Sequence, residues 1–223
     1  MTTIYVGDPL IDSAFMKVRR IPSIERSVWS YWEIRSDKVG YNIHSLYWSA
    51  VNSIAITSQA LYYFLNNFEN EESAKEQKDV TSKYYFYLYG ACNAAYVQQD
   101  GLKSLYNLST DFKKAYEVTD NSAWAEIRDL RAAGFAHPTE YKTDGNRNFV
   151  TMMYFGGLVV SAKGNDNSKT EKIPVSQPKD FLQLFADFRQ ESVVCLEKCA
   201  VEMDKLKDVA TRKVKQAWDE QYS

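Results

Sequence analysis

The chain has 223 residues, and its 27 basic and 29 acidic side chains give a formal net charge of −2. This balance argues against a protein that binds duplex DNA or an anionic membrane through a basic surface. Three cysteines, an odd number, do not build a disulfide framework, so we expect a reducing compartment. The first residues lack the apolar core of a signal peptide, and no stretch approaches the roughly 18 apolar residues of a membrane span. We therefore expect a cytoplasmic protein with no membrane partner.

Scarce glycine and proline, 9 and 5 residues, favour a mainly helical fold. Residues 12–36 predict one helix, or two helices that separate at Ile21-Pro22-Ser23. In the second case Ser23 is the expected N-cap of the second helix. Residues 41–69 carry the clearest helical period, with apolar side chains at alternating spacings of four and three. This face consists of Tyr47, Val51, Ile54, Ser58, Leu61, Leu65 and Phe68.

The same style continues over residues 80–99. A further helical stretch, interrupted near Ser109-Thr110-Asp111, is expected from Leu102, Leu105, Phe112 and Tyr116. The turn at Asp120-Asn121-Ser122 offers N-caps for a helix from Ala123 to about residue 135. His137-Pro138 then ends this helix, because the residue before proline is pushed out of the helical region.

Beyond this helix the pattern changes to strands, over 148–155, 158–163 and 170–175, with a hairpin turn at Gly156-Gly157. Pro178 to about Gln221 returns to a helical period. At about 1.5 Å per residue this helix is too long for a compact globule, so we expect it to bend or to pack against a second chain. The sequence thus predicts a single, mainly α domain over 1–223. It is a helical bundle with a small antiparallel β-hairpin or meander insert at about 148–175, before a long C-terminal helix.

One short segment combines side chains suited to chemistry on a phosphodiester. Arg128 and Arg131 precede His137, one of only two histidines in the chain. An imidazole that titrates near neutral pH can take a proton from a ribose 2′-OH or give one to the leaving oxygen. A guanidinium can hold the phosphate and offset the charge that develops on its oxygens. These residues are the candidate catalytic groups, and this chemistry calls for neither a metal nor a cofactor.

The pattern Arg-x-x-Arg-x-x-x-x-x-His-Pro in a mainly helical chain resembles the motif of HEPN-domain proteins, an Arg followed after four to six residues by a His. The resemblance implies a helical bundle that forms a homodimer, with one motif from each subunit facing a shared cleft. It also implies a metal-independent endoribonuclease of a toxin–antitoxin or phage-defence system, with RNA as substrate and an antitoxin as partner. Arg131 would then hold the phosphate, His137 would be the general acid and base, and Arg128 would support them.

The chain departs from the HEPN pattern at two positions. Ala132 follows the motif arginine, where the family often has a polar residue, and Tyr141 lies four residues after His137 rather than two. The alternative interpretation is structural: Arg128 and Arg131 pair with neighbouring carboxylates such as Glu126 or Asp129, and His137 caps a helix end. The chain would then be a non-catalytic helical interaction protein. A binder of a small ligand in an aromatic pocket is a third reading.

Other residues carry weaker functional hypotheses. Cys195 and Cys199 share one face of a helix, yet two buried small side chains explain them better than a metal site. His44, between two tyrosines, is expected to be structural. The aromatic run over residues 84–89 could stack nucleic-acid bases, although on a helix these side chains point in all directions and burial explains them better.

Overall fold

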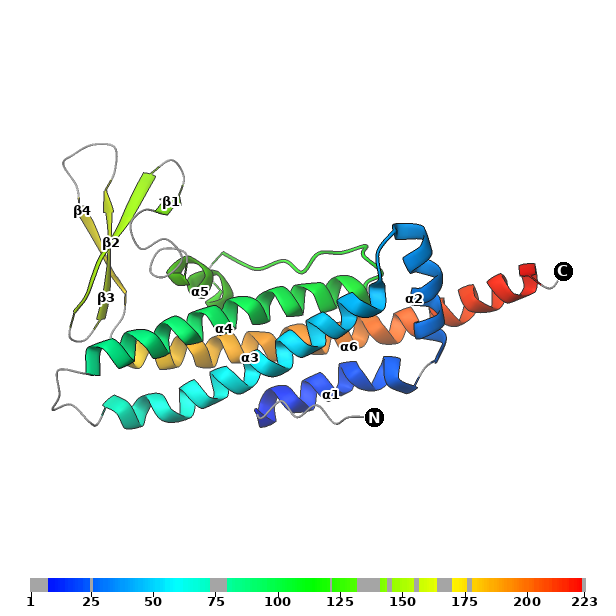
Figure 1. Ribbon diagram of the computed structural model, residues 1–223, viewed down its shortest axis with the longest axis horizontal. Helices are drawn as coiled ribbons and strands as arrows, with labels where there is room; N and C mark the ends of the chain where they lie inside the picture. Colours follow the sequence, from blue (N-terminus) through cyan, green and yellow to red (C-terminus); the bar gives the residue numbers. More distant parts are fainter. Residues whose placement is uncertain are drawn as a thin grey trace. The chain divides into compact units, whose positions relative to one another are not determined.

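The computed structural model describes residues 8–24, 26–72, 80–120, 122–131 and 178–221, together with strand residues 141–143, 146–154, 157–163 and 170–175 (Figure 1). The prediction of a mainly helical protein is confirmed. The helices are α1 (Pro9–Ile24), α2 (Arg26–Val39), α3 (Ile43–Glu72), α4 (Val80–Ser109), α5 (Ala123–Arg131) and α6 (Pro178–Gln221). Within the described residues, no helix combines the length and the apolar character that crossing a membrane requires.

Four strands lie between α5 and α6, namely β1 (Tyr141–Thr143), β2 (Asn146–Tyr154), β3 (Gly157–Lys163) and β4 (Thr170–Val175). They pair antiparallel in the order β1-β2-β3-β4. The ladder between β2 and β3 ends at Tyr154 opposite Gly157, and its register shifts between Val150 and Met152. Gly156, the first residue of the expected hairpin turn, lies outside the described residues.

The chain divides into two compact units, and the three long helices contribute residues to both. Unit 1 consists of Met1–Gln59, Val97–Glu117 and Arg189–Ser223. Its fully buried side chains come from all five helices that it contains, among them Phe15, Trp32, Ile54, Leu102 and Met203.

Unit 2 consists of Ala60–Tyr96 and Val118–Phe188. Its core includes two aromatic pairs: the rings of Phe64 and Phe185 lie 5.0 Å apart, and those of Trp124 and Phe188 lie 5.9 Å apart. Edge-on and tilted ring pairs at these distances add to the stabilisation from burial. These contacts join α3 to α6 and α5 to α6 within the unit.

The start of α1 differs from the prediction. Asp8 caps this helix, because its Oδ1 accepts hydrogen bonds from the backbone N–H groups of Leu10 at 3.0 Å and Ile11 at 3.4 Å. The predicted N-cap at Ser23 is wrong, since α1 continues through Pro22 and Ser23 to Ile24. Pro22 lies in the last turn of α1, where it cannot donate a backbone hydrogen bond to the Val18 carbonyl oxygen, and the helix ends two residues later.

The predicted buried face of α3 is confirmed from Tyr47 to Leu61, whereas Leu65 is only half-buried and the Phe68 side chain lies outside the described residues. Tyr47, Val51, Ile54 and Ser58 are at most 2% exposed, and Leu61 is 5% exposed. The further helical stretch is confirmed at Leu102 and Leu105, which belong to α4, and is wrong at Phe112 and Tyr116, because α4 ends at Ser109 and the backbone that follows is not helical.

The long C-terminal helix is confirmed, and it does not break, because α6 is one uninterrupted helix of 44 residues. Ala210 is its last buried residue. None of residues 211–221 is buried, and Trp218 is 59% exposed. The last turns of α6, red in Figure 1, therefore carry no core contact of their own.

Candidate functional site

Arg131 is the last residue of α5, the helix that carries both candidate arginines. The helix begins where predicted, because the Ser122 hydroxyl oxygen accepts a hydrogen bond from the Ala125 backbone N–H at 3.2 Å. Trp124, Ile127 and Leu130 bury one side of α5. This anchoring places the end of the helix, and with it Arg131, against α4.

Two side chains of α4 hold the Arg131 guanidinium. Its Nε donates a hydrogen bond to Oδ1 of Asn93 at 2.9 Å. Its Cζ lies 4.0 Å from the centre of the Tyr96 ring, a cation–π contact. The amide of Asn93 is itself oriented, because its Nδ2 donates to the carbonyl oxygen of Tyr89 at 2.8 Å. Arg131 is therefore fixed both in direction and in the plane of its guanidinium.

Both groups that hold Arg131 are uncharged. Among the described residues, no carboxylate lies within ion-pair distance of its guanidinium, so the expected pairing with Glu126 is not observed. The Asp129 side chain lies outside the described residues. Burial raises the pKa of the Cys92 thiol beneath this site, and the positive charge of Arg131 opposes that increase. Within the described part of the chain, the charge of Arg131 is thus held in place by uncharged partners.

The other members of the motif are less defined. Arg128 lies one turn before Arg131 on α5 and is exposed. His137 and Ala132 lie outside the described residues, so the approach of His137 to Arg131 stays a prediction. Tyr141 is the first residue of β1.

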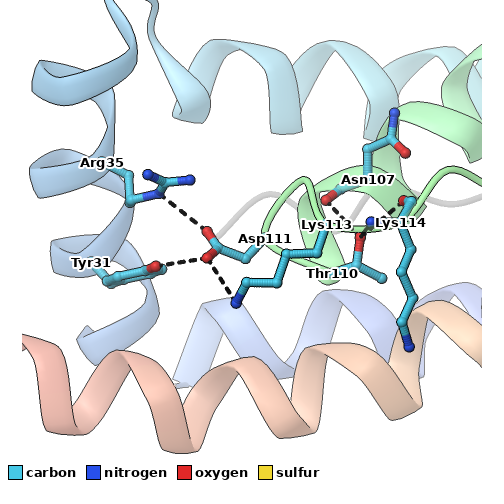
Figure 2. Close-up of polar contacts among 7 residues, drawn as sticks. All are labelled: Tyr31, Arg35, Asn107, Thr110, Asp111, Lys113 and Lys114. Atoms are coloured by element: carbon cyan, nitrogen blue, oxygen red, sulfur yellow. Dashed lines mark hydrogen bonds and ion pairs between the residues drawn. The ribbon is translucent and has the colours of Figure 1, made fainter.

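A second polar cluster surrounds Asp111 in unit 1 (Figure 2). Its carboxylate accepts a hydrogen bond from the Tyr31 hydroxyl at 3.0 Å and forms ion pairs with Arg35 at 3.2 Å and Lys113 at 3.3 Å. Burial, and then the Asp111 carboxylate, raise the pKa of Tyr31 to about 12. Here two cations share one carboxylate, an arrangement that is typical of residues that stabilise the fold.

The two cysteines of α6 and His44 lie in environments that indicate a structural role. Cys195 and Cys199 are fully buried, and burial raises the pKa of Cys195 well above its usual range. Within the described part of the chain, no three side chains of His, Cys, Asp or Glu are grouped to hold a metal ion. A ring nitrogen of His44 lies 3.2 Å from the Trp29 carbonyl oxygen, and its ring packs edge-on against that of Trp29.

The aromatic run over residues 84–89 is described only at its end. The side chains of residues 84–86 lie outside the described residues, whereas Leu88 is buried and Tyr89 is 41% exposed. Base stacking by this run stays a hypothesis.

Asn93 and Tyr96 are the residues of the site that sequence reasoning missed. They lie three positions apart and hence on one face of α4, but this spacing is common and does not by itself indicate a partner on α5. No model of a known protein family, no curated protein and no solved structure matches this chain.

Proposed function

We propose that this chain is a HEPN-like endoribonuclease that cleaves RNA without a metal ion. Arg131 holds the scissile phosphate, His137 acts as general acid and base, and Arg128 supports the binding of the RNA backbone. In this proposal the chain works as a cytoplasmic homodimer in a toxin–antitoxin or phage-defence system. The strands β1–β4 are then an insert in a HEPN-like bundle.

The observation that carries the proposal is the environment of Arg131. Two other arginines of this protein each pair with a carboxylate, since Arg35 faces Asp111 and Arg189 faces Asp8. Arg131 instead has an amide and an aromatic ring as partners. A guanidinium that is fixed in place and keeps its charge is prepared to bind an anion, with little reorganisation when the anion arrives.

The chemistry follows from the two proposed roles. His137 removes the proton from the 2′-OH, whose oxygen attacks the neighbouring phosphorus and forms a 2′,3′-cyclic phosphate. The bond to the 5′-oxygen breaks, and this oxygen leaves with a proton from an imidazolium. Arg131 offsets the negative charge that accumulates on the non-bridging oxygens. The family often has a polar residue directly after the motif arginine, where this chain has Ala132, and Asn93 places a polar side chain beside Arg131 from α4 instead.

Cleavage of a labelled single-stranded RNA tests the proposal, measured with EDTA over about pH 5.5 to 8, where an imidazole titrates. We expect His137→Ala and Arg131→Ala each to reduce the cleavage rate by about 10²–10⁴-fold. Arg212→Ala, which removes an exposed arginine of α6, is the matched control and should leave the rate unchanged. Intact RNA with the parent protein throughout this pH range would overturn the proposal.

The second candidate function is a non-catalytic interaction protein, and the end of α6 favours it. Residues 211–221 contribute nothing to the core, and they expose Trp218. An exposed aromatic residue near a helix end that buries no side chain is typical of a surface that meets a partner. If the chain has this function, His137→Ala changes stability at most and no cleavage is lost.

A further inference from the structure

We propose that α4 completes a subsite for one phosphate group of single-stranded nucleic acid, in which Asn93 and Tyr96 are positioning residues for Arg131. The inference rests on the assignment of Arg131 to phosphate in the proposed function. It adds that an uncharged residue is required at position 93.

In the part of the chain that is described, Arg131 keeps the N–H donors of both Nη atoms available for a ligand. A guanidinium has five N–H donors, and Asn93 takes the one on Nε. Among the described residues, no acceptor takes a hydrogen bond from either Nη atom. The edge formed by the two Nη atoms can therefore donate two parallel hydrogen bonds to the oxygens of one phosphate, the geometry that makes arginine a preferred phosphate ligand.

The edge formed by the two Nη atoms of Arg131 is held in one orientation. The Tyr96 ring covers one face of the guanidinium at 4.0 Å, and both side chains are half-buried. A ring in this position restricts rotation of the guanidinium and keeps water from one of its faces. Because fewer rotamers remain to be lost, binding an anion there costs less conformational entropy.

The charge of the side chain at position 93 decides whether Arg131 can bind a phosphate. Aspartate has nearly the shape of asparagine, and in this place it would form an ion pair with Arg131. Such a pair cancels the charge that the phosphate needs, and it offsets the loss of the hydrogen bond that Asn93 Nδ2 donates to the Tyr89 carbonyl oxygen. Asn93→Asp should therefore preserve stability while it weakens binding, a combination that a purely structural role of Asn93 does not produce.

The chain offers a matched control for this substitution. Asn67 lies on α3 and, like Asn93, donates from Nδ2 to the carbonyl oxygen four residues before it, at 2.7 Å from Tyr63. Asn67→Asp makes the same change of net charge in the same type of helical position. Any effect of net charge alone on nucleic-acid binding appears in both variants.

The experiment measures the affinity of a fluorescent single-stranded deoxyoligonucleotide, which has no 2′-OH nucleophile and stays intact, at low salt. We expect Asn93→Asp and Arg131→Ala to weaken binding about tenfold or more, and Asn67→Asp to change it about twofold or less. The melting temperature of Asn93→Asp should equal or exceed that of the parent. Tyr96→Phe should retain binding, because the ring remains, whereas Tyr96→Leu should weaken it.

Either of two results overturns the subsite: a parent protein that does not bind the oligonucleotide, or Asn93→Asp binding as tightly as Asn67→Asp. If Asn93→Asp melts at a lower temperature, the Tyr96 pair decides: equal binding by Tyr96→Phe and Tyr96→Leu overturns the subsite. The proposed function fails separately. Binding that depends on Arg131 and Asn93 without RNA cleavage by the parent rejects the nuclease and keeps the subsite. If the parent protein cleaves RNA and Asn93→Asp cleaves it at the same rate, the subsite is rejected and the nuclease is kept.

Discussion

Arg35 donates from Nε to Oδ1 of Asp111 across 3.2 Å and so ties α2 to the turn that ends α4 (Figure 2). Asp111 and Phe112 both have positive φ, 54° and 60°. Hydrogen bonds from Phe112 N to Asn107 O at 2.7 Å and from Asp111 N to Leu108 O at 3.1 Å form a Schellman motif. Glycine usually occupies the position that Asp111 takes in this motif, so its side-chain contacts offset an unfavourable backbone conformation.

Substitutions at Asp111 should separate the backbone cost from the carboxylate contacts. We expect Asp111→Ala to lower the free energy of unfolding by about 2–3 kcal/mol, because it removes the contacts and keeps the unfavourable φ. Asp111→Gly should recover about 1 kcal/mol of this loss, since glycine adopts positive φ freely. Urea unfolding at neutral pH measures both. A glycine variant more stable than the parent would show that backbone strain outweighs the contacts with Tyr31, Arg35 and Lys113.

Tyr31 makes stability depend on alkaline pH. Burial, together with Asp111, raises its pKa to about 12 in the folded protein, against about 10 in the unfolded chain. The phenol therefore stabilises the fold fully below about pH 10, and this contribution is lost as the pH rises toward about 12. We expect the unfolding free energy to fall less steeply over this range in Tyr31→Phe than in the parent. Urea unfolding at pH 9 and pH 11 measures the difference, and equal slopes would contradict it.

Much of the helical architecture was accessible from the sequence, because burial imposes a period that apolar residues reveal. The buried face of α3 follows spacings of three and four from Tyr47 to Leu61. Ser122 signals the start of α5 through its capping chemistry. Local rules failed at the start of α1, where the cap is Asp8. Its side chain also pairs with Arg189, 181 positions away, and no local pattern encodes that contact.

In the candidate site, too, the local pattern was accessible from the sequence and the long-range contact was not. Arg131 was identified from a motif within one segment, whereas Asn93 lies 38 residues earlier and contacts it only because α4 and α5 pack together. The end of α4 was misjudged for a related reason. Phe112 and Tyr116 continue an apolar pattern, but they pack from non-helical backbone: the ring of Tyr116 lies 5.2 Å from that of Tyr106. An apolar period does not distinguish these two ways of burying a ring.

The Asp8–Arg189 pair should be costly to break from one side. Asp8 is 1% exposed, and Nε and Nη2 of Arg189 each donate to one of its carboxylate oxygens at 2.5 Å. Arg189→Met leaves this carboxylate buried without a cation, and we expect a loss of about 3–5 kcal/mol. The double variant with Asp8→Asn should be more stable than Arg189→Met alone, because asparagine still caps α1 and carries no charge. A double-mutant cycle by urea unfolding measures this, and additive losses would contradict the prediction.

Two glycines of α4 should respond to alanine with opposite signs. A Cβ at Gly101 would lie 3.1 Å from Cγ1 of Ile54 and 3.2 Å from the Ala50 carbonyl oxygen, so α3 and α4 approach closely there. A Cβ at Gly90 would meet nothing within 4 Å. Gly90→Ala should therefore stabilise the protein by about 0.5–1 kcal/mol through helix propensity. Gly101→Ala should lose about 1–2 kcal/mol, since the strain against a backbone oxygen exceeds the same gain. Thermal and urea unfolding of both variants measure the contrast. Equal stabilisation by the two substitutions would mean that α3 and α4 move apart at Gly101 without cost.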